Sequence, residues 1–474
     1  MVMHSQRGEG SFNFACFVNS ILVLITLAAF SIGNMIGTVE GFTFINKNEK
    51  TWQKEVFFNK NSIVQRKPSP KVWTAMDMSS DDDTKKKILI IGGNGRVGGS
   101  TIRALHKYGK QDTGYKLELL SGGRSQYKFE ASKQRWESLT GKDYGSVGFR
   151  SVELDDHHSL CDALKDVDLV VHTAGPFQQK RNPEVLRAAI EVRVPYIDVC
   201  DDIELAQEAK KLASEAQKAN IPAIVSAGIW PGVSSLMAAH CDEIIRSNGQ
   251  NTEKVDFNFF TAGTGNAGPT ILSATFLIIA EKVLTFQNGK KVLFPPVSDM
   301  RDVDFGKDTG LRNVFRMNLI EAYTCHKVLG IPNVATFFGT APNAWNYLLK
   351  GMALLPKSIL GNRELMNSLA LFSEPLVRLV DSLVGATNVV KVDAYSLDGS
   401  RITALHGHEN LEECVGIAIA GFATEILNGK TCQPGIWFPE EAFTDREIRK
   451  SLLEKCAREA FAWDLPKLPA TTQQ

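Results

Sequence analysis

The chain contains the stretch KILIIGGNGRVGGSTIRALH at residues 87–106. Its first part, Lys87–Ile91, is a short apolar run of the kind found in buried parallel strands. Its last part, Ser100–His106, has the spacing of apolar residues that is typical of a helix. The glycine-rich turn between them decides the fold, because a strand, such a turn and a helix form the first unit of a doubly wound α/β sheet.

Three glycines of this turn, Gly93, Gly95 and Gly98, have the spacing GxGxxG. After a strand and before a helix, this motif is typical of dinucleotide-binding sites. We expect Gly93 to permit the tight turn, Gly95 to let backbone N–H groups approach a pyrophosphate, and Gly98 to let the helix pack closely. The alternative is a purely structural turn. The predicted cofactor-binding residues of this loop are Gly93, Asn94, Gly95, Arg96, Val97 and Gly98.

The end of the second expected strand, Leu117–Leu120, indicates which dinucleotide is bound. A site for NAD normally has an acidic residue there, which binds the ribose hydroxyl groups. This chain instead continues with Ser-Gly-Gly-Arg-Ser at residues 121–125. Arg124 can form a bidentate, charge-assisted pair with a 2′-phosphate, and Ser125 can donate its hydroxyl. The pattern favours NADP over NAD; the alternative is a surface turn with a solvated arginine.

Apolar runs and helical segments alternate from this motif as far as residue 226. Further strands are expected at Leu117–Leu120, Phe149–Leu154, Leu169–His172, Tyr196–Val199 and Ala223–Ser226, with helices at Leu160–Lys165, Pro183–Glu191 and Glu204–Ala219. This alternation predicts a Rossmann-type, doubly wound parallel sheet. Beyond residue 233 the expected strands are longer and more alternating, and a helix is expected at Pro269–Leu284. The second half therefore predicts an α+β domain built on a mixed sheet.

Two more loops follow predicted strands of the first sheet, where the ligands of such sheets bind. Asp155 and its neighbour Asp156 end the third strand, and either they cap the next helix or they contact the adenine. The loop 174–177 ends the fourth strand, and we expect it beside the nicotinamide ring. Outside the glycine loop, the predicted cofactor-binding residues are therefore Arg124, Ser125, Asp155, Ala174, Gly175, Pro176 and Phe177.

Two neighbouring acids, Asp201 and Asp202, follow the fifth expected strand. Paired carboxyl groups can differ in pKa and act as an acid and a base, so both residues are candidate catalytic groups. The alternative is that one of them caps the helix that begins near Glu204.

The charge balance and the cysteine spacing argue against some kinds of partner and binding site. The 474 residues include 53 Lys and Arg against 53 Asp and Glu. Zero net charge gives no general attraction to phosphate backbones, which argues against a nucleic-acid partner. The eight cysteines are scattered without a CxxC pair, so the sequence predicts neither a disulfide scaffold nor a metal site.

The first 84 residues differ from the rest. Gly10–Val39 carries no charge and is most apolar at Ile21–Ile32, which suits a signal peptide or a membrane anchor. Residues 45–76 then contain seven basic and two acidic residues, a composition typical of transit peptides. The pair resembles the bipartite presequences of algae with secondary plastids and predicts delivery to a plastid (chloroplast). The alternative is an uncleaved anchor with a tether.

Four motifs in combination resemble the saccharopine dehydrogenase-like family, and most of all its plastid members in plants and algae. They are Ile90–Gly99, Val170–Phe177, Tyr196–Asp202 and Ala227–Val233, and the resemblance continues through residues 261–269, 337–342 and 433–440. It implies an NADP-binding Rossmann domain followed by a mixed-sheet domain that closes over the nicotinamide.

The resemblance to the family does not identify a single substrate. Saccharopine reductases carry Asp-Pro-Gly where this chain has Trp230-Pro231-Gly232, and this loss of an acid disfavours saccharopine. Related branches include enoyl reductases that act on lipid-like substrates. Trp230 and the apolar segments Leu348–Leu355 and Leu369–Leu383 suit a hydrophobic substrate, although core packing explains such segments more often.

The sequence therefore predicts an NADP(H)-dependent oxidoreductase that acts on a small plastid metabolite. Hydride transfer is expected at Gly175–Phe177, and the proton would come from Asp201, Asp202 or the second domain. One alternative is a membrane-tethered NADP-binding protein without catalysis; another is a true saccharopine dehydrogenase or reductase. The expected parts are a signal peptide or anchor (1–41), a transit-like segment with linker (42–84), the Rossmann domain (85–233), a substrate and dimerisation domain (234–430), which makes a homodimer one expected assembly, and a packed C-terminal segment (431–474).

Overall fold

The computed structural model describes residues 85–263, 269–429 and 433–468. The expected signal peptide, the anchor Ile21–Ile32 and the transit-like segment lie outside the described residues, as does the glycine-rich stretch 264–268. In the part of the chain that is described, none of the helices combines the length and the apolar character needed to cross a membrane. Plastid delivery and membrane anchoring stay predictions.

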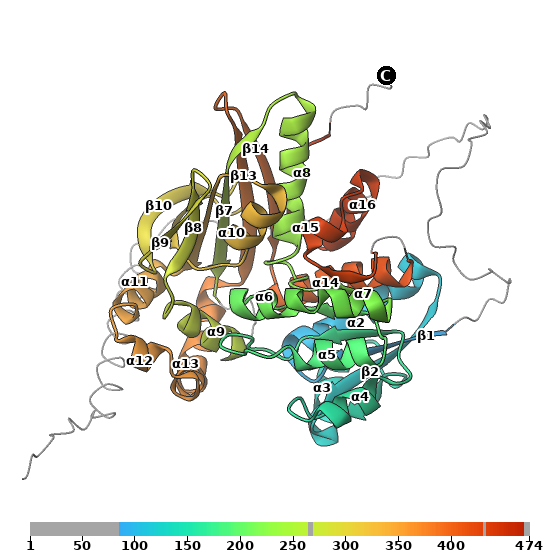
Figure 1. The fold of residues 1–474 in the computed structure, drawn as a ribbon. Helices are drawn as coiled ribbons and strands as arrows, with labels where there is room; N and C mark the ends of the chain where they lie inside the picture. Colours follow the sequence, from blue (N-terminus) through green and yellow to red (C-terminus); the bar gives the residue numbers. More distant parts are fainter. Residues whose placement is uncertain (1–84, 264–268, 430–432, 469–474) are drawn as a thin grey trace, which may run out of the picture. The chain divides into compact units, whose positions relative to one another are not determined.

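The first sheet has seven parallel strands (Figure 1). Their order is β15-β6-β5-β4-β1-β2-β3, in which β1 and β4 are neighbours although β2 and β3 separate them in sequence. The strands are β1 (Lys85–Ile91), β2 (Lys116–Gly123), β3 (Gly148–Ser151), β4 (Leu169–His172), β5 (Tyr196–Asp198), β6 (Pro222–Ile224) and β15 (Gly435–Trp437). Their connecting helices are α2 (Arg96–Thr113), α3 (Gln126–Thr140), α4 (His157–Leu164), α5 (Glu184–Glu191), α6 (Ile203–Lys211) and α7 (Ala213–Ala219). The doubly wound sheet predicted from the sequence is confirmed.

Strand β1 explains why the apolar run decides the fold. Ile88 and Ile90 are buried in one hydrophobic cluster, while Leu89 and Ile91 are buried in the cluster on the other face of the sheet. Burial of each such side chain stabilises the fold by about 1.5–3 kcal/mol. A strand that contributes to both clusters must therefore lie inside the sheet, with helices over both faces.

The second sheet is mixed. Its order is β10-β11-β12-β7-β13-β14-β16, with β8 paired to β12 and β9 paired to β8. Strands β7 and β12 run parallel, and the other pairs are antiparallel. The strands are β7 (Thr252–Ala262), β8 (Val283–Gln287), β9 (Lys290–Phe294), β10 (Ser298–Asp304), β11 (Leu311–Arg316), β12 (Asn333–Ala341), β13 (Thr387–Ser396), β14 (Arg401–His408) and β16 (Ala462–Asp464). This confirms the predicted α+β mixed-sheet domain.

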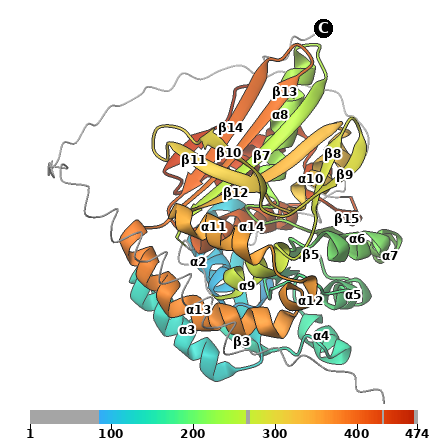
Figure 2. The ribbon, with the colours of Figure 1, turned by 90° about the vertical axis from the view of Figure 1, so that its left-hand side faces the viewer.

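Helices surround the second sheet on several sides. Figure 2 shows α9, α11, α12 and α13 grouped below its strands, on the side of the first sheet. The helices after β6 are α8 (Val233–Ser247), α9 (Pro269–Ile278), α10 (Glu321–Thr324), the π-helix η1 (Cys325–Leu329), α11 (Asn343–Met352), α12 (Lys357–Leu360), α13 (Arg363–Val384), α14 (Leu411–Leu427), α15 (Pro439–Ala442) and α16 (Arg446–Cys456).

The last part of the chain joins both sheets. Helix α14 packs on α2 so closely that a Cβ atom on Gly416 would lie 2.5 Å from the backbone carbon of Ser100. Strand β15 extends the first sheet beside β6, and β16 extends the second sheet beside β14. The domain boundaries proposed from the sequence stay predictions, but both sheets take strands from beyond residue 430.

One predicted element is wrong in part. The helix expected at Pro269–Leu284 ends at Ile278, and β8 begins at Val283. The segment is apolar almost throughout, so periodicity cannot distinguish a helix from a strand there. Pairing with a distant strand determines that Val283–Gln287 is a strand, because Phe286 of β8 pairs with Val334 of β12.

Candidate active site

Four loops with predicted site residues lie next to one another at one edge of the first sheet. They follow β2, β1, β4 and β5, which are parallel and consecutive in the sheet. At about 4.8 Å between neighbouring strands, the ends of β2 and β5 are about 14 Å apart. The strand order reverses between β1 and β4, which is where open α/β sheets bind their ligands.

Three glycines at the turn after β1 occupy positions without room for a side chain: Gly92, Gly93 and Gly98. Gly92 has a positive φ of 86°. A Cβ atom on Gly98 would lie 2.3 Å from the carbonyl oxygen of Gly92, so the predicted close approach of the helix to the turn is real. The tight turn itself belongs to Gly92 and not, as expected, to Gly93, whose Cβ would instead lie 2.4 Å from Ser121 Oγ.

The turn leads into the N-terminus of α2. Gly95 is exposed at the N-cap position, with no side-chain cap and no acidic residue in the first turn. The first N–H groups of a helix have no acceptor within it, and the helix dipole adds partial positive charge there. This end of α2 can therefore bind a pyrophosphate.

Asn94 connects the glycine turn to the end of β2. Its side chain accepts a hydrogen bond from Ser121 Oγ at 2.7 Å and donates one to the carbonyl oxygen of Ser125 at 3.2 Å. Its backbone carbonyl accepts a hydrogen bond from Ser132 Oγ of α3 at 2.9 Å. Asn94 therefore holds the loops after β1 and β2 together, in addition to its predicted place in the cofactor loop.

Arg124 is exposed at the end of β2. Among the described residues it forms no ion pair, so its guanidinium group is available to an anion. Ser125 caps α3 by accepting a hydrogen bond from the N–H of Lys128 at 3.3 Å. Arg96, in contrast, lies 3.8 Å from Glu412 of α14, and its pKa is lowered by burial and by the nearby charge of Arg378.

A ring contact and two hydrogen bonds hold the loop after β4 in place. Phe177 is buried with its ring edge-to-face against His172, at a centroid distance of 5.2 Å. Arg363, the first residue of α13, donates to the carbonyl oxygens of Pro176 at 2.7 Å and Gln178 at 3.1 Å. Arg363 could not be predicted from the sequence, because no local pattern connects it to a loop 185 residues earlier.

Three acids follow or end β5, and two of them have structural partners. Asp198 accepts hydrogen bonds from the N–H groups of Cys200 and Ser226 and from Tyr196 Oη. Asp202 caps α6 by accepting a hydrogen bond from the N–H of Leu205 at 2.8 Å, as in the alternative weighed for it.

Burial raises the pKa of both Asp198 and Asp201, but only Asp201 is one of the predicted catalytic acids, and Asp198 is held by three hydrogen bonds. Burial raises the pKa of Asp201 to about 6, with smaller contributions from the charges of Asp202 and Glu281. The group is therefore close to the range in which a carboxyl group exchanges protons near neutral pH. Of the two predicted catalytic acids, Asp201 has the electrostatic properties of an acid–base group.

Buried acids of the second half lie near Asp201. Burial raises the pKa of Glu321 to about 7, and Asp201 is among the charges that raise it further. Glu321 accepts a hydrogen bond from Ser234 Oγ at 2.9 Å. Glu321 is not among the predicted site residues, and its only signal in the sequence is an acid within the largely apolar run Met317–Tyr323.

Other predicted residues lie in supporting positions. Asp156 caps α4, whereas Asp155 is exposed without such a role. Trp230 packs on Phe259 and Phe338, with centroid distances of 4.8 and 6.0 Å. Trp230 therefore packs against the second sheet; its predicted contact with a substrate stays a prediction.

Comparison with known proteins agrees with this arrangement. Residues 88–224 match the family model of the saccharopine dehydrogenase NADP-binding domain, so the cofactor is NADP. A domain of this kind belongs to oxidoreductases.

Two curated relatives are carboxynorspermidine synthases. The one from Vibrio cholerae is 22% identical over 370 residues, which are 70% of this chain and 87% of the relative. The one from Vibrio alginolyticus is 23% identical over 210 residues, which are 42% of this chain and 50% of that protein.

Among solved structures, the saccharopine dehydrogenase (L-Glu forming) of Saccharomyces cerevisiae is similar. It matches with a TM-score of 0.52 and 14% identity, over 78% of this chain and 96% of the yeast protein. At this identity the likeness concerns the fold: a parallel dinucleotide-binding sheet followed by a mixed-sheet domain.

Proposed function

We propose that the protein is an NADP(H)-dependent oxidoreductase in which Asp201 exchanges the proton that accompanies hydride transfer. The order of the strand ends is the observation that carries this proposal. The phosphate-binding groups Arg124 and Gly95 follow β2 and β1, the fixed loop at Phe177 follows β4, and Asp201 follows β5. A dinucleotide laid along this edge would have its 2′-phosphate at one end and its reactive ring beside the acid at the other.

The residues present fit NADP. When bound, NADP supplies the hydride chemistry, and this chain supplies binding and orientation. The α2 N-terminus would hold the pyrophosphate, Arg124 the 2′-phosphate, and the Phe177 loop would position the nicotinamide. Arg363 keeps that loop in place through two backbone carbonyl groups.

We infer further that the substrate is an amine or becomes one. Asp201, Glu281 and Glu321 each have a pKa raised by burial and by at least one other carboxyl group. Such a concentration of acids stabilises an ammonium group, and an acid with a pKa near neutrality can protonate a nitrogen as it forms. The names of the relatives support this class, since carboxynorspermidine is by its name a carboxylated polyamine.

The reaction balances as the reduction of a carbon–nitrogen double bond. Hydride from NADPH would add to the carbon, and Asp201 would donate a proton to the nitrogen, giving a secondary amine and NADP⁺. The reverse direction would oxidise a secondary amine such as saccharopine, with Asp201 as the proton acceptor.

A substrate panel tests this proposal. NADPH oxidation would be measured with short diamines mixed with carboxylated aldehydes, and NADP⁺ reduction with saccharopine; apolar enoyl and carbonyl compounds form the third arm. We expect turnover in an amine arm. Turnover only in the apolar arm would reject the amine proposal and favour the hydrophobic substrate. NADPH binding without turnover in any arm would favour the non-catalytic alternative.

We also propose that residues 1–84 deliver the protein to a plastid. The uncharged run followed by a basic segment supports this. The N-terminus of the protein isolated from its natural cells would decide: a start near Phe42 or Ala75 supports cleavage, whereas an intact Met1 in a membrane fraction supports an anchor.

A further inference from the structure

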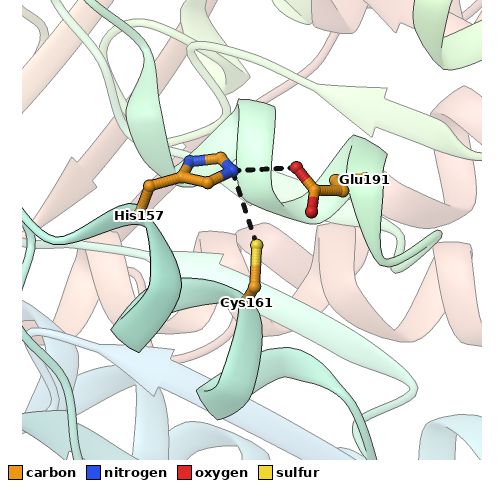
Figure 3. A group of neighbouring side chains, drawn as sticks. All are labelled: His157, Cys161 and Glu191. Carbon is orange, nitrogen blue, oxygen red and sulfur yellow. Dashed lines mark hydrogen bonds and ion pairs between the residues drawn. The ribbon is translucent and has the colours of Figure 1, made fainter.

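Three side chains with metal-binding atoms come together on two helices of the first domain, apart from the strand ends described above. They are His157 and Cys161 of α4 and Glu191 at the end of α5 (Figure 3). His157 and Cys161 are four residues apart, so they lie on the same face of α4. Glu191 reaches this face because α5 packs beside α4.

The sulfur–nitrogen distance suits a tetrahedral ion, whereas the nitrogen–oxygen distance would have to lengthen from 2.9 Å to about 3.4 Å. Cys161 Sγ lies 3.5 Å from His157 Nε2, and the same nitrogen lies 2.9 Å from Glu191 Oε2. All three ligand atoms lie within 4.8 Å of one another. For bonds of about 2.3 Å to sulfur and 2.05 Å to nitrogen, tetrahedral geometry puts those two atoms about 3.6 Å apart. The sulfur and nitrogen are therefore already at the separation that a zinc ion requires.

A second carboxylate orients the histidine. Glu184 Oε2 lies 3.3 Å from His157 Nδ1, on the far side of the ring from Cys161. A carboxylate that accepts the Nδ1 proton fixes the tautomer in which Nε2 is free to bind a metal, which is the usual arrangement around zinc-bound histidines. Ion pairs of a protonated His157 would account for Glu184 and Glu191, but not for the Cys161 thiol beside Nε2, which is the contact that points to a metal.

We propose that His157 Nε2, Cys161 Sγ and the Glu191 carboxylate bind a divalent cation of the zinc class. Nitrogen, thiolate and carboxylate together are a ligand set for zinc or cobalt and a poor one for magnesium or calcium, which take oxygen ligands. A water molecule would complete the tetrahedron. Because the ligands come from two helices, the ion would connect α4 to α5.

This site was not predictable from cysteine spacing. The absence of a CxxC pair led to the prediction of no metal site, but that pattern concerns sites built mostly from cysteines. Here one cysteine and one histidine lie a helical turn apart, and the carboxylate comes from a helix 30 residues later.

Cobalt binding to the full chain tests the proposal. Purified protein would be stripped with a chelator and titrated with Co²⁺ alone, while the near-ultraviolet absorption of a thiolate–cobalt bond is followed; Zn²⁺ would then be added as a competitor. We expect about one equivalent of Co²⁺ to give this band and Zn²⁺ to abolish it. Absence of the band in the wild-type protein would overturn the proposal.

Variants identify the ligands. Cys161→Ser is expected to lose the thiolate band, and His157→Gln to weaken binding at least about tenfold. Glu184→Gln, which alters only the orienting carboxylate, is expected to weaken binding by about tenfold. His158→Ala is the matched control, since His158 is on the same helix, is exposed and pairs with Asp162 instead.

The variants also separate misfolding from a wrong assignment. Circular dichroism and NADPH binding would be measured on each variant, and Glu191→Gln replaces any variant that fails these checks. A folded Cys161→Ser protein that retains the band would show that another cysteine binds the cobalt and would overturn the proposal. Equal loss in His158→Ala would do the same.

Discussion

The two ends of the proposed cofactor site are built from different kinds of residue. On the adenine side, the loops after β1 and β2 present the exposed Arg124 and the open N-terminus of α2. On the nicotinamide side, the loops after β4 and β5 present the buried Phe177 and the acid Asp201, whose pKa burial raises. The proposed adenine end has a permanently charged, exposed arginine, whereas the proposed nicotinamide end has a carboxyl group whose pKa is raised by burial.

This difference corresponds to two tasks. A phosphate is bound by permanent charge and N–H groups, which need no change in protonation and keep their charge when exposed. Proton transfer needs a group that gains and loses a proton near the working pH, and burial is the means of bringing a carboxyl group there. Substitutions on the adenine side should therefore change affinity for the cofactor, and substitutions on the nicotinamide side should change turnover.

The largest effect is expected for Asp201→Asn. Removal of a general acid typically lowers kcat by about 10²–10⁴-fold, while the adenine side still binds NADPH. In the wild-type protein, kcat for reduction should fall as pH rises through about 6, because Asp201 then loses its proton. Steady-state rates and NADPH titrations measure both quantities.

Asp202→Asn is the matched control for this experiment. Asparagine is also a good N-cap, so α6 should keep its cap; only the hydrogen bond from the Gln179 N–H to the second carboxylate oxygen would be lost, and kcat should fall much less than in Asp201→Asn. If Asp202→Asn lost activity and Asp201→Asn did not, Asp202 would be the acid–base group and the assignment of Asp201 would be wrong.

Arg124→Ala is expected to have the next largest effect, on the other side. Loss of its charge-assisted pair with the 2′-phosphate should weaken NADPH binding by about 1.5–3 kcal/mol and leave NADH binding little changed. Fluorescence titration with both cofactors measures this, and Lys128→Ala, a nearby exposed cation, is the control. Equal losses for both cofactors would show that Arg124 does not contact the 2′-phosphate.

Glu321→Gln tests the buried acids through stability. The pKa of Glu321 is 4.5 in an ordinary environment and about 7 in the folded protein, so the folded state holds its proton more tightly. Its contribution to stability is therefore present below about pH 4.5 and is lost as pH rises through about 7.

Glutamine cannot lose a proton, so the stability of the Glu321→Gln protein should not fall for this reason as the pH rises. The free energy of unfolding of the wild-type protein, relative to Glu321→Gln, should be about 1–3 kcal/mol lower at pH 8 than at pH 4.5. Denaturant unfolding at the two pH values measures it. A constant difference between the two proteins would mean that Glu321 is not held protonated.

The smallest effect is expected for Arg363→Ala. Two hydrogen bonds from a half-buried guanidinium to the loop carbonyls would be lost, and the free energy of unfolding should fall by about 1 kcal/mol. The looser loop should lower kcat more than it raises the Kd of NADPH. Arg363→Lys should restore part of the lost stability and part of the lost kcat. A loss confined to NADPH affinity would place Arg363 in cofactor binding instead.

The two sheets also differ in how much of them the sequence predicted. Six of the seven strands of the first sheet were predicted from local signals, because apolar runs alternate with helical segments along that part of the chain. The second sheet depends on pairing between distant segments, and the strand at Val283 could not be distinguished from a continuing helix. Strand β15 also joins the first sheet from beyond residue 430, which no local pattern announces.

The residues of the candidate site also differ in whether the sequence could predict them. The glycine loop and Arg124 were recognisable because spacing along one segment defines them. Arg363 and Glu321 were not, because their importance comes from segments that are far apart in sequence and meet only in the folded chain. The choice between Asp201 and Asp202 also required the structure, since burial and capping are properties of the fold.

Titration of the wild-type protein with NADPH and NADH, followed by fluorescence, tests the central claim most directly. We expect saturable binding of NADPH and, from the 1.5–3 kcal/mol expected for the 2′-phosphate contact, at least about tenfold weaker binding of NADH. Failure to bind either cofactor, or equal affinity for both, would contradict it.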